Sequence, residues 1–289
     1  MLSKDEIRQA VFWASEQEVM APKPGNVNCF SDGHNMAVQD FIRSARAIAP
    51  VMAQPGLSVG QRILRAVEAT REVVDCNTNL GIVLLFAPLC SAVERCERFD
   101  QLPDALSAVL AQLTVDDARL CYQAIRLAEA GGLGSSSEQD ISEEPSVTLL
   151  NAMELARDRD QIALQYVSNF NTLWQVSLPA LTNSLNSGES VEWATAFAYL
   201  KLLSDAPDSL ICRKQNRETA TAVTNKAKQL VFQMNKNSKL NTYSAQLTAW
   251  DIELKQKSIN PGTTADLVAA TLLLWAFEDG FSADRISVP

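Results

Sequence analysis

The chain has 289 residues, of which 47% are apolar and 20% charged, so it has a globular composition and enough length for one large core over residues 1–289. Its net charge of −9, with no run of Lys and Arg, excludes a general nucleic-acid binder, which needs a basic face. The longest apolar stretch, Leu80 to Val93, is too short to cross a membrane, and the N-terminus is too charged for a signal peptide.

Helical periodicity dominates the sequence in chain order. Ser3 followed by Glu6 forms a capping box, which predicts a helix start. Alternating strand patterns are nearly absent. We therefore predict an all-α fold, a compact multi-helix array with its active site in the interhelical loops. The expected helices cover residues 4–20, 36–53, 59–75, 78–97, 103–111, 115–130, 146–157, 159–186, 189–203, 216–235, 241–256 and 264–278.

The first polar break, residues 21–36, contains Pro-Lys-Pro-Gly at 22–25. The prolines fix φ and Gly25 allows a turn, so Lys23 would be a point charge on a stiff backbone, suited to a phosphate. The alternative is a helix-ending turn with a solvated lysine. His34, the only histidine, is either structural or a proton carrier or phosphate donor near neutral pH.

The second break precedes an apolar helix at Asn77 and Thr78. These residues either cap the helix or help its N-terminus to receive a phosphate or a ribose hydroxyl. The third break, residues 131–146, is rich in Gly, Ser and Glu, and we expect a mobile loop there. Its glycines lack a preceding strand and a Gly-Lys-Ser/Thr sequence, which excludes a dinucleotide fingerprint and a Walker loop.

Two further breaks carry carboxylates. Asp208, with Arg213 and Lys214, forms a mixed-charge cluster that suits a metal and phosphates, or is a solvated loop. Asp266 follows Pro-Gly-Thr-Thr-Ala at a helix start, where it either bonds back to the cap or binds magnesium through oxygen.

These motifs, taken together over residues 10–280, resemble the triphosphoribosyl-dephospho-coenzyme A synthase family. The first and last motifs are the most specific. The matching residues are Glu18, Pro22-Lys23-Pro24-Gly25, Val27, Gly33-His34, Met36, Phe41, Arg43-Ser44, Asn77-Thr78, Gly81, Asp208-Ser209, Arg213 and Pro261-Gly262-Thr263-Thr264-Ala265-Asp266-Leu267.

The resemblance implies an all-helical, ATP-dependent triphosphoribosyl transferase. A ribose hydroxyl of 3′-dephospho-coenzyme A would attack C1 of the ATP ribose, and adenine would leave. Adenine needs protonation to leave, and a carboxylate relieves the oxocarbenium-like state. Glu18 and His34 are then candidates for proton transfer, and Asp208 and Asp266 for Mg²⁺ or the oxocarbenium. The substrate-binding set comprises Lys23, Gly25, Arg43, Ser44, Asn77, Thr78, Arg213, Lys214, Gly262, Thr263 and Thr264.

Two alternatives stay open. Residues 131–144 differ from the family's usual stretch, so a related enzyme could use another acceptor, as in biosynthesis of a one-carbon carrier cofactor. A non-catalytic helical nucleotide-binding protein is the other. In each case we expect small-molecule partners rather than nucleic acid or membrane, and the apolar helices leave room for a homodimer. Six cysteines without a Cys-x-x-Cys pair indicate reduced thiols in a cytoplasmic protein.

Overall fold

The computed structural model describes residues 1–34, 36–129, 139–236 and 239–281. Regular structure in these ranges is helical, and they contain no β-strand. The loop after the first helix makes two isolated antiparallel bridges, Asn28 with Ser31 and Gly33 with Met36. The predicted all-α fold class is confirmed. In the same ranges, no helix has both the length and the apolarity that a membrane crossing requires.

The helices follow one another with short connections. The α-helices are α1 (Lys4–Met20), α2 (Val38–Met52), α3 (Val59–Arg71), α4 (Leu80–Val93), α5 (Leu102–Ala111), α6 (Val115–Leu127), α7 (Leu149–Ala156), α8 (Gln161–Val167), α9 (Leu178–Asn186), α10 (Val191–Asp205), α11 (Ser209–Lys214), α12 (Arg217–Met234), α13 (Ser244–Gln256) and α14 (Gly262–Phe281). Between them lie the 3-10 turns η1 (Phe99–Gln101) and η3 (Leu240–Tyr243) and the π-helix η2 (Leu173–Ser177).

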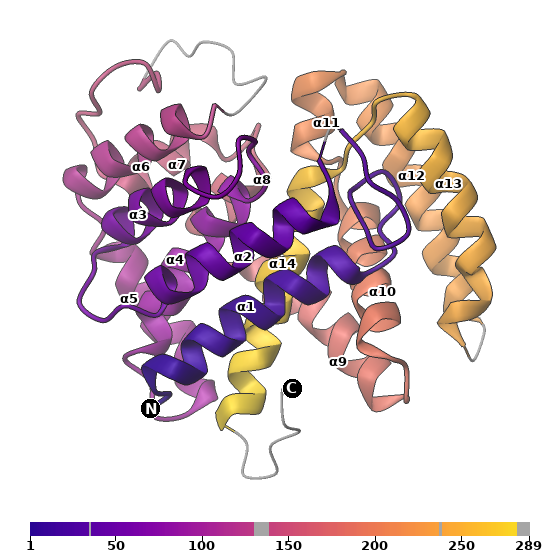
Figure 1. Cartoon of the computed structure of the whole chain (residues 1–289), viewed down its shortest axis with the longest axis horizontal. Helices are drawn as coiled ribbons and strands as arrows, with labels where there is room; N and C mark the ends of the chain where they lie inside the picture. Colours follow the sequence, from indigo (N-terminus) through magenta and orange to yellow (C-terminus); the bar gives the residue numbers. More distant parts are fainter. Residues whose placement is uncertain (35, 130–138, 237–238, 282–289) are drawn as a thin grey trace.

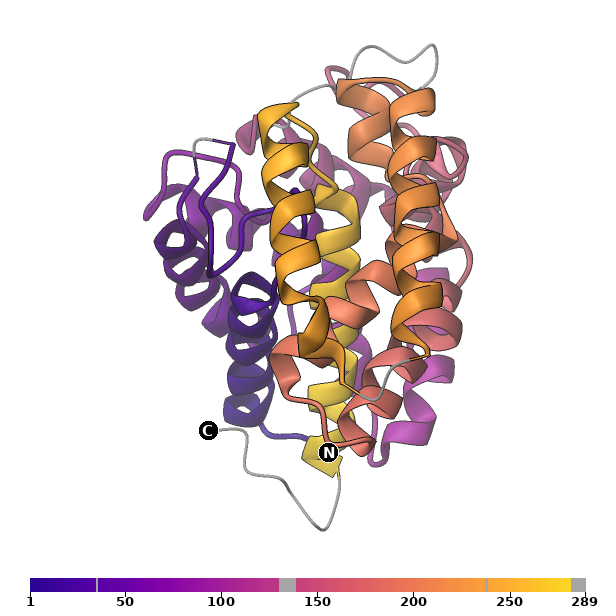
Figure 2. The ribbon, with the colours of Figure 1, turned by 90° about the vertical axis from the view of Figure 1, so that its right-hand side faces the viewer.

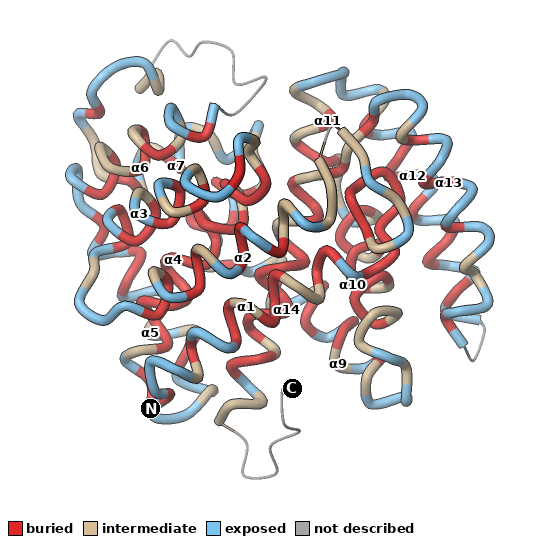
Figure 3. The backbone as a smooth tube through the Cα atoms, viewed as in Figure 1, coloured by how far each residue is buried: buried red, intermediate tan, exposed pale blue. Residues whose placement is uncertain are grey.

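Helices α4 and α14 lie at the centre because their sequences have no polar face. Every residue of α4 from Ile82 to Val93 is buried, and so is every residue of α14 from Leu267 to Leu274. A helix that is apolar all round must be covered on every side. Helix α14 contacts α1, α4, α9 and α10, and Figures 1 and 3 show it buried among the other helices.

The other helices are arranged around α14. Figure 1 shows α3 to α8 on one side and α9 to α13 on the other, with α1 and α2 crossing the front. Figure 2 looks at the second side and shows α12 and α13 in front of α14. Trp13 of α1 stacks on Trp275 of α14, with ring centroids 5.3 Å apart, so the first helix of the chain is anchored on the last.

The helix expected over residues 159–186 is interrupted. Helix α8 ends at Val167, and Asn169 and Phe170 adopt the left-handed conformation, with φ of 52° and 60°. The Phe170 side chain is fully buried, and Asn169 Nδ2 donates to the Pro103 carbonyl at 3.1 Å. Tertiary contacts therefore make this break, and no glycine or proline in the sequence marks it.

Two other predictions concern segments near the site. Residues 209–214, expected as part of a loop, form α11, whose N-cap is Asp208. Of the segment 131–146, predicted as a mobile loop, residues 131–138 lie outside the described residues. The capping box at the start of α1 is confirmed, with the Glu6 N–H donating to Ser3 Oγ at 3.3 Å.

Candidate active site

A cavity of about 600 Å³ lies where the starts of α4 and α14 meet α1, α8 and α11. It is formed by segments far apart in the sequence, and most of the polar breaks identified in the sequence reach it. The predicted residues that line it are Glu18, His34, Asn77, Thr78, Arg213, Lys214, Gly262, Thr263 and Asp266. The predicted residues that do not line it are Lys23, Gly25, Arg43, Ser44, Asp208 and Thr264.

Asp266 lies on the first turns of α14 and packs against the start of α4. A Cβ placed on Gly81 would lie 2.1 Å from Asp266 Oδ2, so only glycine leaves room for the carboxyl. No described residue donates a hydrogen bond to this carboxyl. Burial, together with the negative charges of Glu18 and Asp208, raises the pKa of Asp266 well above its ordinary value. The site therefore favours the protonated acid.

The starts of α4 and α14 present unpaired backbone amides to the cavity. The N–H groups of Gly81 and Ile82 in α4, and of Gly262 and Thr263 in α14, have no hydrogen-bond partner among the described residues. Helix N-termini carry partial positive charge and bind anions through such groups. Two N-termini directed at one cavity therefore favour a bound anion.

Glu18, on the last turn of α1, is buried beside Lys23. Lys23 Nζ donates to Glu18 Oε1, to Asn26 Oδ1 at 2.9 Å and to the Val27 carbonyl at 2.8 Å, which uses all three of its N–H donors. Burial raises the pKa of Glu18 and lowers that of Lys23, and the opposite charge of the partner resists each shift. Glu18 Oε2 is buried and has no described partner, and Glu18 is one of the residues that line the cavity.

The position of Lys23 corrects its predicted role as a phosphate ligand. Its ammonium is fully buried and already surrounded by protein acceptors, so no donor remains for a ligand. The stiff Pro-Lys-Pro-Gly turn does hold the lysine in place, as expected, but directs it inward. In this structure Lys23 positions Glu18.

The turn itself is fixed by contacts from α10 and α13. Gly25 has a φ of 85°, which favours glycine, and its N–H donates to Asp251 Oδ1 at 2.8 Å. Tyr199 donates its hydroxyl to the Pro24 carbonyl at 2.8 Å. Lys255 Nζ bridges Asp251 Oδ2 and the Ser31 carbonyl. Gly25 therefore has a structural role in the turn, and its predicted role as a substrate ligand does not fit this structure.

His34 lines the cavity with its ring anchored at one end. Its Nε2 lies 2.9 Å from the Gly25 carbonyl, so Nε2 carries a proton and Nδ1 is left to accept or donate elsewhere. Its backbone φ of 56° is in the left-handed region, which is uncommon for a residue other than glycine. Both features hold the ring at the cavity.

Cationic side chains gather just before the start of α8 and at the end of α11. Arg213 donates through Nη1 to Asp160 Oδ2, while its Nε is buried without a described partner. Lys214 is exposed, and both residues line the cavity. Arg159, which sequence reasoning did not select, lines it too. These three cations give this wall the charge that an acidic chain needs to bind phosphates.

Asp208 is buried away from the cavity, and all of its acceptor capacity is used. Oδ1 accepts from the N–H groups of Leu210 (2.8 Å) and Ile211 (3.0 Å), and Oδ2 accepts from the Thr264 N–H and hydroxyl, both at 2.7 Å. Its predicted catalytic and metal-binding roles do not fit these contacts. Asp208 and Thr264 instead join α11 to α14 and so position Arg213 beside Asp266.

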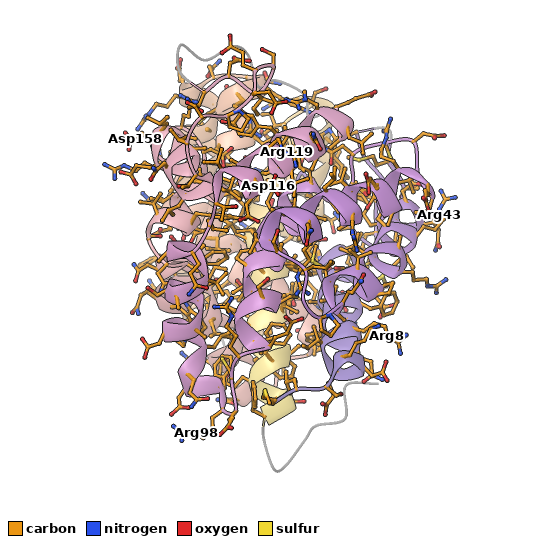
Figure 4. All side chains as sticks on the ribbon, turned by 90° about the vertical axis from the view of Figure 1, so that its left-hand side faces the viewer. Arg8, Arg43, Arg98, Asp116, Arg119 and Asp158 are labelled. Atoms are coloured by element: carbon orange, nitrogen blue, oxygen red, sulfur yellow. The ribbon has the colours of Figure 1, made fainter. Side chains whose placement is uncertain are left out.

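Ser44 and Arg43 of α2 take different positions from those predicted. The Ser44 hydroxyl lies 2.6 Å from Thr78 Oγ1, so it supports a cavity residue from behind. Arg43 pairs with Asp40 at 2.5 Å, and Figure 4 shows it at the outer edge of the molecule. A phosphate role for Arg43 therefore does not fit this structure.

Comparisons with known proteins cover nearly the whole chain. The family model described as CitG, ATP:dephospho-CoA triphosphoribosyl transferase, matches residues 4–285. The 2-(5''-triphosphoribosyl)-3'-dephosphocoenzyme-A synthase of Pectobacterium atrosepticum is 26% identical over 303 residues, which cover 94% of this chain and 89% of that protein. A Vibrio cholerae protein of the same name, qualified as probable, is 26% identical over 275 residues, covering 89% and 82%.

The fold has a solved relative as well. It is similar to the crystal structure of an Archaeoglobus fulgidus protein that carries the provisional name triphosphoribosyl-dephospho-coA synthase. The TM-score is 0.64 at 25% sequence identity, and the match covers 81% of this chain and 97% of the other. The similarity thus extends from the sequence motifs to the arrangement of the helices.

Proposed function

The chain belongs to the family of ATP:dephospho-CoA triphosphoribosyl transferases, and we propose that it transfers the triphosphoribosyl group of ATP to a ribose hydroxyl of 3′-dephospho-coenzyme A, releasing adenine. The observation that carries this proposal is the composition of the cavity. The cavity contains cations and unpaired helix amides that suit a triphosphate, and two carboxyls that suit glycosyl transfer. The family model matches this chain from residue 4 to 285.

The reaction exchanges one bond at C1 of the ATP ribose for another. The bond from C1 to N9 of adenine breaks, and a bond from C1 to the acceptor oxygen forms. The acceptor hydroxyl loses a proton and adenine gains one, so the overall reaction conserves protons. The site needs a base, an acid and negative charge near the oxocarbenium-like state.

Glu18 and Asp266 supply these roles in our proposal. Glu18 is held through Oε1 by Lys23, and its free Oε2 accepts the proton of the attacking hydroxyl. Asp266, whose raised pKa favours the protonated form, donates to the departing adenine. Two carboxyls with different surroundings can thus take opposite roles at one pH.

The triphosphate is a handle and not the reacting group. We assign it to Arg213 and Lys214, together with the amides of Gly262 and Thr263 at the start of α14. This arrangement would fix C1 of the ribose near Asp266, since Gly262 and Asp266 belong to the same helix start.

Magnesium enters this proposal with the triphosphate. Among the described residues no group of three or more His, Cys, Asp or Glu side chains could hold a metal ion. Asp208 is saturated by hydrogen bonds, and a protonated Asp266 is a poor ligand. These residues do not fit a protein-held ion, so we derive no step from it. Mg²⁺ bound mainly through substrate phosphates is common in such sites.

We also propose that the protein acts in the cytoplasm. All six cysteines are unpaired in the structure. Free thiols persist where the compartment is reducing.

The test is a chromatographic assay with ATP, Mg²⁺ and dephospho-coenzyme A. We expect one adenine released for each acceptor molecule that gains the mass of a triphosphoribosyl group. The matched control is the Asp266→Asn variant, which keeps the volume of the side chain beside Gly81. Formation of ADP or AMP with no free adenine would overturn the proposal and indicate a kinase-like or ligase-like reaction.

A further inference from the structure

The cavity extends beyond the carboxyls into a part with different chemistry. There its wall is formed by α4, α6, α7 and α8, which contact one another in the order α4 to α8 to α7 to α6. We call this part the apolar arm. The residues that define it are Leu84, Cys121, Ile125, Ala152, Met153 and Ala163.

The apolar arm is lined by uncharged groups. Burial raises the pKa of Cys121 to about 12, so its thiol is neutral at physiological pH. The hydroxyl of Tyr122 beside it donates to the Gln139 carbonyl at 2.8 Å. Three charged residues line the cavity near these groups: Glu129 and Arg159 are exposed to solvent, and Asp140 is partly exposed. A charged ligand group would lose its hydration here without a partner.

The arm is also elongated. Helix α7 lines it from Leu149 to Ala156, which at 1.5 Å per residue is about 10 Å of wall. Arg159 lies in the short connection between α7 and α8, and Ala163 of α8 lines the arm. A cation therefore lies where the apolar wall begins, which suits an uncharged chain attached to a phosphate.

The two proposed substrates differ in what they could place there. Adenine has polar atoms around its whole edge, and burying them against methyl groups would leave them unpaired. Dephospho-coenzyme A carries a pantetheine chain, which is uncharged, extended and attached to a diphosphate. Building on the proposed function, we infer that the apolar arm receives this pantetheine chain and so selects the acceptor.

The experiment narrows the arm from one side. Ala152→Trp fills it from α7, and Asn151→Trp, at the exposed neighbouring position of the same helix, is the matched control. For Ala152→Trp we expect the KM for dephospho-coenzyme A to rise about tenfold or more, while the KM for ATP stays within about twofold. Asn151→Trp should change neither, and thermal melting should show both variants folded.

A rise in the KM for ATP instead would overturn the inference, because the arm would then hold the adenine of the donor. Unchanged KM values for both substrates would also overturn it. Calorimetry on the wild-type protein and Ala152→Trp separates this inference from the proposed reaction. Dephospho-coenzyme A should bind the wild-type protein more tightly than ADP, which lacks pantetheine, and Ala152→Trp should remove that difference. If no adenine is released but this difference is found, the proposed reaction fails and the arm remains.

Discussion

Two regions near the cavity differ in whether their polar groups have hydrogen-bond partners in the protein. They are the turn at residues 22–28 and the starts of α4 and α14. In the turn, Lys23 Nζ and the Gly25 N–H are bound by protein acceptors. At the helix starts, the amides of Gly81 and Gly262 and the carboxyl of Asp266 have no partner among the described residues. These three residues are partly buried and line the cavity, so a ligand there could pair with their polar groups. We therefore expect the turn to have a structural role and the two helix starts to contact the ligand.

The largest effect is expected at the start of α14, where Asp266 lies. Asp266→Asn removes the proton donor without changing the shape of the wall. We expect kcat for adenine release to fall by about 10²–10⁴-fold, the usual range for a catalytic acid. ATP affinity, measured by calorimetry, should change little. A kcat within threefold of the wild-type value would remove Asp266 from the catalytic role.

The scaffold side is tested by Lys23→Met. Removing the ammonium leaves the buried Glu18 carboxyl without its partner, and breaking a buried pair in this way costs about 3–5 kcal/mol of unfolding free energy. Urea unfolding measures this loss. Under conditions where the variant is folded, ATP should bind as to the wild-type protein. A large loss of ATP affinity in the folded variant would return Lys23 to the phosphate site.

Gly81→Ala tests how closely the two helix starts must approach. The added Cβ would lie 2.1 Å from Asp266 Oδ2, so α4 or Asp266 must move, at a cost of about 1–3 kcal/mol. Adenine release should fall along with stability. Gly280→Ala at the other end of α14, where the nearest atom is a Leu2 methyl at 3.1 Å, is the control and should be near neutral. Equal effects in both variants would contradict the special packing at Gly81.

A smaller effect is expected at the cationic wall. Arg213→Gln should raise the KM for ATP about tenfold, because one of several phosphate contacts is lost. The control is Arg119→Gln, whose side chain pairs with Asp116 on the surface labelled in Figure 4. If both variants keep the wild-type KM, the triphosphate lies elsewhere.

The smallest effect concerns stability against pH. Since the pKa of Asp266 is raised in the folded protein, the unfolded chain releases this proton at lower pH than the folded one. Stability therefore falls as pH rises from the ordinary carboxyl pKa to the raised one, and then stays lowered. Asp266→Asn should remove this decline, so the variant should melt above the wild-type protein at neutral pH. Identical melting profiles from pH 4 to 8 would contradict the shift.

The sequence predicted which segments form the site better than it predicted which way their side chains point. Helices α4 and α14 were predictable because apolar residues surround them, and the polar starts at Asn77 and Gly262 follow from that pattern. Whether the Lys23 side chain faces inward or outward depends on where Glu18, on the last turn of α1, contacts the chain that follows the helix. No local sequence pattern predicts this contact between Glu18 and Lys23.

Asp208 shows the same limit, because its sequence context suggests a metal site whereas its contacts are structural. A carboxylate near Arg213 and Lys214 has the composition of a metal site, yet its four hydrogen bonds go to helix starts. Two of those donors belong to Thr264, more than fifty residues away. Arg159 was overlooked because it was placed at the start of the helix predicted over residues 159–186, outside the polar breaks, whereas the Asp160 cap leaves it just before α8.

The stacking of Trp13 on Trp275 has a consequence for how the protein is made. Helix α1 leaves the ribosome long before its partner α14, because the core contacts between them have very long sequence separation. At about 5–20 residues per second, α1 waits roughly tens of seconds for that partner. Glu18 and Asp266 lie on these same two helices. The acid and base of the proposed reaction therefore meet only once α14 has been synthesised, and a nascent chain that stops before α14 carries no assembled site.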